Sequence, residues 1–472
     1  MLGDSFVARS PERTPAVRMK ALVYGLAVAG EATVAALARH GYDVAVVDDV
    51  VDEAKLAVAE RLGVQLVIGG TFDLGRVGEY TVLAPAPGIP ETHPVILAAF
   101  EAGVPVRTEL ELAYRWEQER AETAGVRPRP ILAITGTDGK TTTTELTVAI
   151  LRAAGLRTEA VGNTDTPMVA AIDDPDLDAF VVEATSFRLA WTEQFRADAA
   201  VWLNLAPDHL NWHTDLDSYV AAKSRIFSLQ RPDDVAIGFA DDPVVMRQLA
   251  AAPARTRTFA ATGADYRVET RDGDVWLVGP DGPIASAATM RRALPHDLTN
   301  ALAAAALVLE TGLATEQHIA TALASFSAPP HRLEPIGEGG GVRWYNDSKA
   351  TTPHAAATAI RAFDSVVLIA GGSRKGVDLS PMGAYPERMR GVVAIGQAGP
   401  DIAGVFDGVT TVVTADDMAA AITAAAELAH PGDAVVLSPG CASFDWYANY
   451  VARGDDFRRK VTEHLASQEG PA

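Results

Sequence analysis

The chain has 472 residues, 48% of them hydrophobic, which is enough for roughly two to four domains with buried cores. Its formal net charge of -21 argues against nucleic acid or an anionic membrane as a partner. A single cysteine, Cys441, excludes an internal disulfide and fits a reducing cytosol. No apolar run is long enough to span a membrane, and residues 1–18 do not resemble a secretory signal, so we expect a cytoplasmic protein.

Strand and helix patterns divide the chain into three segments behind a loose N-terminal tail at 1–18. We predict domains at 19–127, 128–328 and 329–472, with a linker of glycine and proline at 121–130 before the second. Strands that alternate with helices are typical of parallel sheets. We therefore expect an α/β protein with three mostly parallel sheets and flanking helices. The first and third domains would be Rossmann-like, and the central one P-loop NTPase-like.

The first domain opens with an apolar strand at 21–24 and a glycine turn at 25–30. The turn carries Ala27 where a dinucleotide site has its middle glycine, so a nicotinamide site is the weaker interpretation. Asp48 ends the next strand, at 44–47, where it could contact a ribose or a base.

In the second domain, an apolar strand leads through Thr135-Gly-Thr-Asp-Gly-Lys-Thr141 into a helical stretch. This is the layout of a phosphate cradle. Backbone N–H groups face the phosphates, Lys140 meets the outer ones, and the Thr141 hydroxyl can hold Mg²⁺. The glycine expected five residues before Gly139 is Ile134, so the motif is a shorter variant. The alternative is a glycine-rich turn with an exposed lysine.

Three further polar residues of the second domain are candidates for metal binding. Glu183 ends a buried strand beside the cradle, where a carboxylate is a natural Mg²⁺ ligand. His209 follows the strand at 199–203 and could bind metal or position a substrate. Lys223 lies on the next helix, and a lysine with a lowered pKa can react with CO₂ to give an anionic carbamate. The alternatives are a surface glutamate, a structural histidine and a solvated helix lysine.

Polar residues also gather near the second boundary. His296 and Asn300 are four residues apart at a helix start, so they could contact a nucleotide or cap the helix. Arg332 could reach a triphosphate across a cleft or form an interdomain salt bridge. Asp347 and Lys349 lie in a strand-to-helix turn, which could be a polar site or a capping turn.

The third domain has two loops after apolar strands. Lys375 could bind a carboxylate there, and Ser443 could donate a hydrogen bond to one. Cys441 lacks the neighbours of a nucleophile and is interpreted as a small buried side chain. In the second domain, residues 266–278 alternate with period two around Asp272-Gly273, which predicts a β-hairpin.

Taken in order, these motifs resemble those of the Mur ligase family over nearly all of the chain after residue 18. The motifs are Thr135-Gly-Thr-Asp-Gly-Lys-Thr141, Glu183-Ala-Thr-Ser-Phe-Arg-Leu189, Asp208-His209, Ala222-Lys223, His331-Arg332, Asn346-Asp-Ser-Lys-Ala-Thr351 and Ser438-Pro-Gly-Cys-Ala-Ser443. The resemblance implies an ATP-dependent amide ligase of peptidoglycan precursor synthesis, and hence a part in cell wall biogenesis, cell shape, cell division and the cell cycle.

Within the family, the Glu-x-x-Ser-Phe and Ser-Pro-x-Cys-Ala-Ser elements resemble the D-glutamate-adding member. The resemblance therefore implies ATP, UDP-N-acetylmuramoyl-L-alanine and D-glutamate as small-molecule substrates, joined through an acyl phosphate. We expect the chain to act as a monomer, without nucleic acid or membrane partners.

The resemblance also implies roles for individual residues. Lys140, Glu183, His209 and Lys223 would be catalytic. Thr141 and Glu183 would hold one Mg²⁺, and His209 and carbamylated Lys223 a second. ATP would be bound by Gly136, Thr137, Asp138, Gly139, Lys140, Thr141, Thr142, Asn300, Arg332 and Asp347. The other substrates would be bound by Asp48, Asn163, Ser186, Lys349, Thr351, Lys375, Ser443 and Phe444.

The chain departs from the family pattern around the expected uridine site. It has Ala27 in the glycine turn, Ala86 in place of a serine, and Asp49 and Val50 where uncharged or basic side chains are expected. Uridine recognition stays open for that reason. The competing functions are a folylpolyglutamate-type ligase, a dinucleotide oxidoreductase and a nucleotide-binding paralogue without catalysis. The metal-site residues that the chain retains argue against the last of these.

Overall fold

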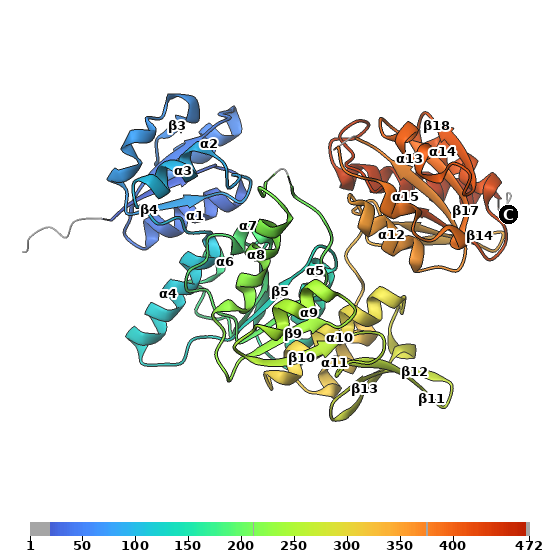
Figure 1. The fold of residues 1–472 in the computed structure, drawn as a ribbon, viewed down its shortest axis with the longest axis horizontal. Coiled ribbons are helices and arrows are strands. Elements are labelled where there is room, and N and C mark those ends of the chain that lie inside the picture. Colours follow the sequence, from blue (N-terminus) through green and yellow to red (C-terminus); the bar gives the residue numbers. More distant parts are fainter. Residues whose placement is uncertain (1–18, 211, 374–375, 469–472) are drawn as a thin grey trace, which may run out of the picture.

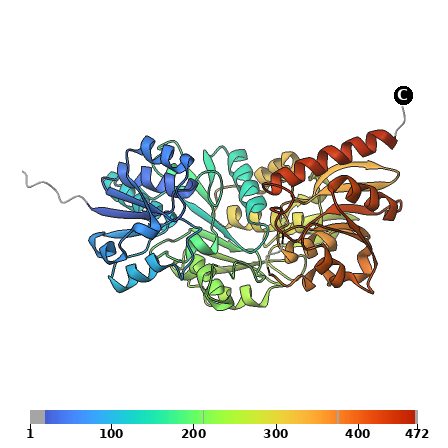
Figure 2. The same cartoon turned by 90° about the horizontal axis from the view of Figure 1, so that it is seen from above.

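The computed structural model describes residues 19–210, 212–373 and 376–468. Three successive α/β units each have their own large sheet, and Figures 1 and 2 both show the second unit between the other two. The predicted fold class is confirmed. We call the units the N-terminal, central and C-terminal domains and divide them at the predicted boundaries, 127/128 and 328/329, which stay predictions. The tail predicted at 1–18 lies outside the described residues.

The N-terminal domain has a four-stranded parallel sheet in the order β3-β2-β1-β4. Its elements are β1 (Lys20–Tyr24), α1 (Val28–Arg39), β2 (Asp43–Asp48), α2 (Glu53–Leu62), β3 (Leu66–Ile68), β4 (Val82–Pro85), α3 (Pro94–Glu101) and α4 (Glu109–Ala124). The linker predicted at 121–130 is wrong in its first part, because α4 runs to Ala124. The good helix formers of this segment continue the helix until Gly125 ends it in the left-handed conformation, with φ of 66°.

The central domain has a six-stranded parallel sheet in the order β10-β9-β8-β5-β7-β6. Its strands are β5 (Ile131–Thr135), β6 (Thr158–Gly162), β7 (Ala179–Glu183), β8 (Ala199–Trp202), β9 (Val235–Phe239) and β10 (Arg255–Phe259). Its helices are α5 (Lys140–Ala153), α6 (Met168–Ala171), α7 (Ser186–Leu189), α8 (Leu216–Ser228), α9 (Pro243–Ala250), α10 (Pro295–Glu310) and α11 (Glu316–Ser325). Strand β5 is flanked by β7 and β8, so the loops after these three strands meet at one edge of the sheet.

A small antiparallel sheet belongs to the central domain as well (Figure 1). It consists of β11 (Arg267–Arg271), β12 (Asp274–Gly279) and β13 (Gly282–Ser286). The predicted hairpin is confirmed. Asp272 and Gly273 at its tip have φ of 52° and 87°, as a two-residue turn with two left-handed positions requires.

The C-terminal domain has a six-stranded sheet in the order β14-β15-β19-β16-β17-β18. Its strands are β14 (Glu334–Gly339), β15 (Val342–Asn346), β16 (Val366–Gly371), β17 (Met389–Ile395), β18 (Thr411–Ala415) and β19 (Ala434–Leu437). Its helices are α12 (Pro353–Arg361), α13 (Gly399–Phe406), α14 (Met418–Leu428) and α15 (Tyr450–Gln468). The pair β14–β15 is antiparallel and the other pairs are parallel. Across the described parts of all three domains, no helix has the length and apolar character needed to cross a membrane.

Candidate active site

The predicted phosphate cradle lies between β5 and α5, in the loop at residues 136–139, which we call the phosphate loop. Gly139 has φ of 84°, and a Cβ atom there would lie 2.8 Å from Asn300 Oδ1, so only glycine fits. Helix α5 begins directly after it at Lys140. The Lys140 ammonium folds back and donates to the carbonyls of Gly136 (2.9 Å) and Thr137 (2.7 Å). The cationic side chain therefore lies within the loop itself.

Asn204 braces the phosphate loop from the end of β8. Its Oδ1 accepts hydrogen bonds from the backbone N–H groups of Thr137 (3.0 Å) and Asp138 (2.9 Å). Its Nδ2 donates to the Asp138 carbonyl (3.1 Å). Sequence analysis did not single out Asn204, although its place directly after a buried strand was a usable signal. The brace fixes the backbone that would face the phosphates.

Glu183 lies at the carboxyl end of β7 and is only 2% exposed, so its interpretation as a surface glutamate is wrong. Its Oε1 accepts a hydrogen bond from Asn163 Nδ2 (2.8 Å), and Asn163 Oδ1 in turn accepts one from Arg188 (2.8 Å). Glu183 Oε2 is buried and has no hydrogen-bond partner among the described residues. A buried carboxylate oxygen without a donor is suited to a hard cation such as Mg²⁺.

Lys223 is only 1% exposed on α8, so its interpretation as a solvated lysine is wrong. Its Nζ donates to the Gly136 carbonyl (2.7 Å) and lies 4.7 Å from the centre of the Tyr219 ring. Burial, aided by the charge of Lys140, lowers the pKa of Lys223 well below its ordinary value. The neutral amine favoured by that shift is the form that reacts with CO₂.

His209 follows β8 with φ of 56° and a side chain that is 43% exposed. Its Nε2 lies 3.1 Å from Asp208 Oδ2. Its ring packs edge-on against the Phe187 ring, with 4.6 Å between the two ring centres. Within the described ranges, no three His, Cys, Asp or Glu side chains come together as a metal cluster. The two predicted metal sites therefore depend on the Thr141 hydroxyl and on a modified Lys223 as ligands.

A cavity of about 900 Å³ lies between the central and C-terminal domains, and we call it the interdomain cavity. It brings together predicted residues of both domains. Those lining it are Thr137, Asp138, Gly139, Lys140, Thr141, Asn163, Glu183, His209, Arg332, Lys349 and Thr351. Tyr450, which sequence analysis missed, also lines it, and its ring centre lies 5.2 Å from Lys349 Nζ. A polar cavity with phosphate-loop and lysine side chains fits highly charged substrates.

A second cavity of about 560 Å³ also lies between these domains. Six of the predicted ATP-binding residues line it: Asp138, Gly139, Thr142, Asn300, Arg332 and Asp347. His296 and His354 line it as well. The position of this cavity beside the phosphate loop is suited to the nucleoside part of a bound nucleotide.

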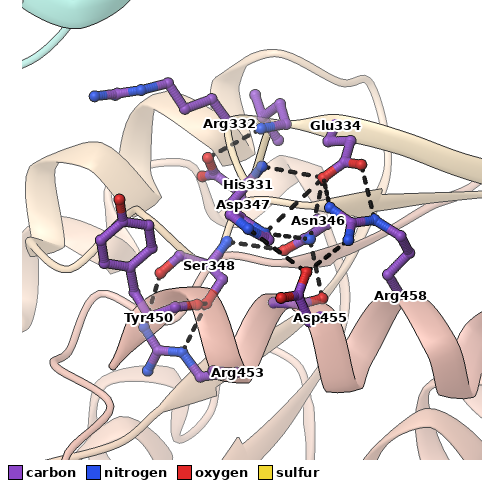
Figure 3. A network of polar contacts seen from close by, with 12 residues as sticks. His331, Arg332, Glu334, Asn346, Asp347, Ser348, Tyr450, Arg453, Asp455 and Arg458 are labelled. Atoms are coloured by element: carbon purple, nitrogen blue, oxygen red, sulfur yellow. Dashed lines mark hydrogen bonds and ion pairs between the residues drawn. The ribbon is translucent and has the colours of Figure 1, made fainter. Parts of the chain in front are cut away.

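Arg332 reaches across the interdomain boundary. Figure 3 shows it extending away from the polar network around His331, and its Nη2 donates to the Thr141 hydroxyl (2.8 Å). Among the described residues Arg332 forms no interdomain salt bridge, so that alternative is wrong. Asp347 remains within the C-terminal domain, where it accepts hydrogen bonds from Ser438 Oγ (2.7 Å) and Leu333 N (3.1 Å). Burial raises the pKa of Asp347 to about 7.

Arg453, at the start of α15, connects two loops of the C-terminal domain, and Figure 3 shows it beside Ser348 of the first loop. It is 1% exposed and donates to the hydroxyl and carbonyl of Ser348 (3.0 and 2.8 Å). It also donates to the carbonyls of Cys441 and Ala442 (both 3.2 Å). These are the loops after β15 and β19 that carry predicted substrate residues. Sequence analysis did not identify this brace.

The other residues predicted to bind the amino acid are placed differently. Ser443 is buried and Phe444 is 72% exposed, and neither is among the residues lining the interdomain cavity. Cys441 is buried, as predicted. Lys375 lies outside the described residues.

The capping residue of α12 is Thr352, whose side chain accepts a hydrogen bond from Ala355 N. The capping role suggested for the turn at 346–351 is therefore wrong.

Two residues predicted to bind substrate, Asp48 and Ser186, form polar contacts with other residues of this chain. The Asp48 carboxylate accepts from Leu26 N (2.7 Å), Lys55 Nζ (2.7 Å) and Val50 N (3.0 Å), which fixes the glycine turn beside it. Ser186 is buried, with its Oγ 2.9 Å from His213 Nε2. Substrate contacts by Asp48 and Ser186 stay predictions.

Comparisons with known proteins agree with this architecture. A family described as the Mur ligase middle domain matches residues 134–308, and the Mur ligase, glutamate ligase domain matches residues 331–441. Two relatives are each named UDP-N-acetylmuramoylalanine--D-glutamate ligase. The protein from Frankia casuarinae is 39% identical and covers 93% of both chains, and that from Nitrosococcus oceani is 36% identical and covers 96% of this chain and 98% of its own.

The fold is also that of a solved relative. The structure of MurF ligase from Thermotoga maritima in complex with ADP aligns with a TM-score of 0.58 and 16% identity, covering 96% of each chain. The matched family domains and the named relatives show an ATP-dependent ligase of peptidoglycan precursor synthesis, here built from three α/β domains. The chain belongs to the Mur ligase family, and the resemblance found in its motifs is confirmed.

Proposed function

We propose that this chain joins D-glutamate to UDP-N-acetylmuramoyl-L-alanine through an amide bond, at the expense of ATP. The observation that carries the proposal is the interdomain cavity. There the phosphate loop of the central domain faces Lys349 and Thr351 of the C-terminal domain. The names of the relatives, which match over more than nine-tenths of the chain, support the choice of substrates.

The reaction follows from what the two sides of the cavity can bind. Lys140 and the N-terminus of α5 bind the ATP phosphates. They also stabilise the negative charge that develops during phosphoryl transfer. The terminal carboxylate of the nucleotide sugar attacks the γ-phosphorus, giving an acyl phosphate and ADP. The amine of D-glutamate, oriented by Lys349 and Thr351, attacks the acyl carbon. Phosphate leaves, and the amine loses a proton. The catalytic effect is mainly positioning and charge neutralisation.

We propose two Mg²⁺ ions at this site. Thr141 and Glu183 would hold the first, since Glu183 Oε2 is buried and no described residue donates a hydrogen bond to it. His209 and a carbamylated Lys223 would hold the second, since the buried Lys223 amine has a lowered pKa. Bound Mg²⁺ would neutralise phosphate charge. The low pKa of Lys223 favours its reaction with CO₂, which turns a cation into an anionic ligand.

We propose from the same reaction that the protein takes part in cell wall synthesis. The product is a cell wall precursor, so the enzyme would contribute to cell shape and, through the cell cycle, to cell division. We propose that it works as a monomer in the cytoplasm, where ATP and nucleotide sugars are available. The single, buried Cys441 is compatible with a reducing compartment.

The direct test is phosphate release from ATP and Mg²⁺ with UDP-N-acetylmuramoyl-L-alanine, with and without D-glutamate. L-Glutamate is the matched control. Release that requires D-glutamate would support the proposal. Release with a different amino acid or acceptor would keep the ligase and change its substrate. ATP binding without any release would contradict catalysis by this chain alone.

A further inference from the structure

A histidine of the C-terminal domain is paired with the phosphate loop of the central domain. His354 Nδ1 lies 2.6 Å from Asp138 Oδ2, although the two residues are 216 positions apart in the chain. Their side chains are 40% and 26% exposed, and both residues line the second cavity. None of the motifs considered above gives His354 a role. The pair is a direct contact between the loop that faces the phosphates and the domain that would hold the amino acid.

Both partners are rigidly mounted. The Asp138 backbone is held by Asn204 through its N–H (2.9 Å) and its carbonyl (3.1 Å). His354 is the second residue of α12, and Thr352 caps that helix by accepting from Ala355 N. These hydrogen bonds hold the two segments that carry the pair. A displacement of α12 relative to the phosphate loop therefore breaks the pair.

Helix α12 connects the pair to the predicted amino-acid site. His354 is only three residues after Thr351 and five after Lys349, and both of these line the interdomain cavity. The turn between them is itself fixed, because Lys349 N donates to the His331 carbonyl (3.1 Å). The position of Asp138 is thus linked to that of Lys349 through a short, braced segment.

The charges around the pair favour its ionised form. Asp138 faces Lys140 on α5 and Arg332 from the interdomain boundary, in addition to His354. His354 faces Arg361 on its own helix and Asp242, which caps α9. Burial alone would raise the pKa of Asp138. The hydrogen bond and charge of His354, together with the charges of Lys140 and Arg332, outweigh burial and lower that pKa. The same hydrogen bond raises the pKa of His354.

We propose that His354 is a positioning residue that, through Asp138, aligns the phosphate loop with the Lys349–Thr351 segment across the interdomain boundary. The alignment brings the acyl-phosphate end of the site into line with the amine that attacks it. A small misplacement between reacting groups costs rate rather than binding. This inference rests on the proposed ligase function.

The test is a double-mutant cycle with His354→Asn, Asp138→Asn and the double variant. His354→Asn should lower kcat about tenfold and change the KM for ATP less than about threefold. In the Asp138→Asn background the same change should lower kcat less than about twofold, because the partner is already absent. His354→Lys, which restores a cation, should recover part of the loss. Exposed His430, in the same domain, supplies the matched control His430→Asn.

A readout without turnover separates this inference from the proposed function. In nucleotide-free protein, His354→Asn should speed amide hydrogen exchange both in residues 136–140 and in α12, whereas His430→Asn should not. If the wild-type chain makes no product with D-glutamate, the proposed function fails and the exchange result alone decides the alignment. Unchanged exchange, or fully additive losses in kcat, would overturn the role of His354. Thermal unfolding of every variant checks that it is folded.

Discussion

The Asn163 side chain donates one hydrogen bond to the Glu183 side chain, from Nδ2 to Oε1 at 2.8 Å, and the other carboxylate oxygen is buried without a donor among the described residues. The amide of Asn163 therefore orients the carboxylate and leaves one oxygen free to bind a cation. Gly162, just before Asn163, has φ of 93°, and a Cβ there would lie 2.6 Å from the Glu183 carbonyl. This close approach sets the amide beside the carboxylate.

Replacement of this carboxylate by an amide should remove the anionic Mg²⁺ ligand while keeping its shape. We expect Glu183→Gln to lower kcat by at least about 100-fold and to raise the Mg²⁺ concentration needed for half-maximal rate. The measurement is D-glutamate-dependent phosphate release over a Mg²⁺ titration. Glu159→Gln on the neighbouring strand β6 is the control. A Glu183→Gln enzyme with normal Mg²⁺ dependence would remove Glu183 from the metal site.

The buried Lys223 should be needed as a carbamate rather than as a cation. We expect both Lys223→Ala and Lys223→Arg to abolish activity, since arginine keeps the charge but forms no carbamate. Added acetate or formate should restore part of the activity of Lys223→Ala by supplying a carboxylate in the vacated space. Lys460→Ala on α15 is the control. Full activity of Lys223→Ala without any additive would rule the carbamate out.

The burial of Lys223 shows how much the sequence could have revealed. Tyr219, Lys223 and Phe227 are spaced by four on α8, so they share one face, and all three are buried. The spacing was visible in the sequence, but a lysine on a helix is ordinarily solvated, and only the neighbouring phosphate loop explains why this one is not. Strands and the loops after them were easier to predict from the sequence, because an apolar run followed by glycine or polar residues is a local pattern.

Residues whose role depends on contacts with segments distant in the sequence could not be predicted in this way. Asn204 and Arg453 brace loops that are distant in sequence, and Tyr450 enters the interdomain cavity from the start of α15. The place of Asn204 after a buried strand was a local signal, but nothing in their own segments distinguishes Arg453 and Tyr450 from ordinary polar or aromatic positions. The pair of Asp138 and His354 is likewise set by the placement of two domains.

The raised pKa of Asp347 predicts a stability that depends on pH. Between its ordinary pKa of 3.8 and its folded value of about 7, folded Asp347 holds a proton that the unfolded chain has released. The folded state then binds more protons, so the free energy of unfolding falls as pH rises through this window. The difference between the two pKa values corresponds to about 4 kcal/mol at most.

Asp347→Asn should remove this part of the pH dependence in nucleotide-free protein. The amide can still accept from Leu333 N and can donate to Ser438 Oγ, so the hydrogen bonds are kept. Urea unfolding at several pH values between 5 and 8 measures the slope. Asp364→Asn is the control, since that side chain is fully exposed. Equal slopes for wild type and Asp347→Asn would show that Asp347 is ionised throughout.

Arg453 offers a test of how the amino-acid side of the cavity is held. Its guanidinium makes four hydrogen bonds to the loops after β15 and β19, and lysine cannot reproduce that planar geometry. We expect Arg453→Lys to lower the free energy of unfolding by about 2–4 kcal/mol, because buried carbonyls lose their donors. We also expect the KM for D-glutamate to rise several-fold while the KM for ATP changes less, since most of the predicted ATP-binding residues lie in the central domain.

The matched change is Arg459→Lys, six residues further along the same helix, where the side chain is 56% exposed and pairs with Asp456 and Glu463. An exposed pair of this kind contributes little, so both stability and kinetics should stay near wild type. Unfolding by urea and separate titrations of ATP and D-glutamate distinguish the two effects. An equal rise in both KM values would mean that Arg453 supports the domain as a whole. A selective change for D-glutamate would mean that the two braced loops form its binding site.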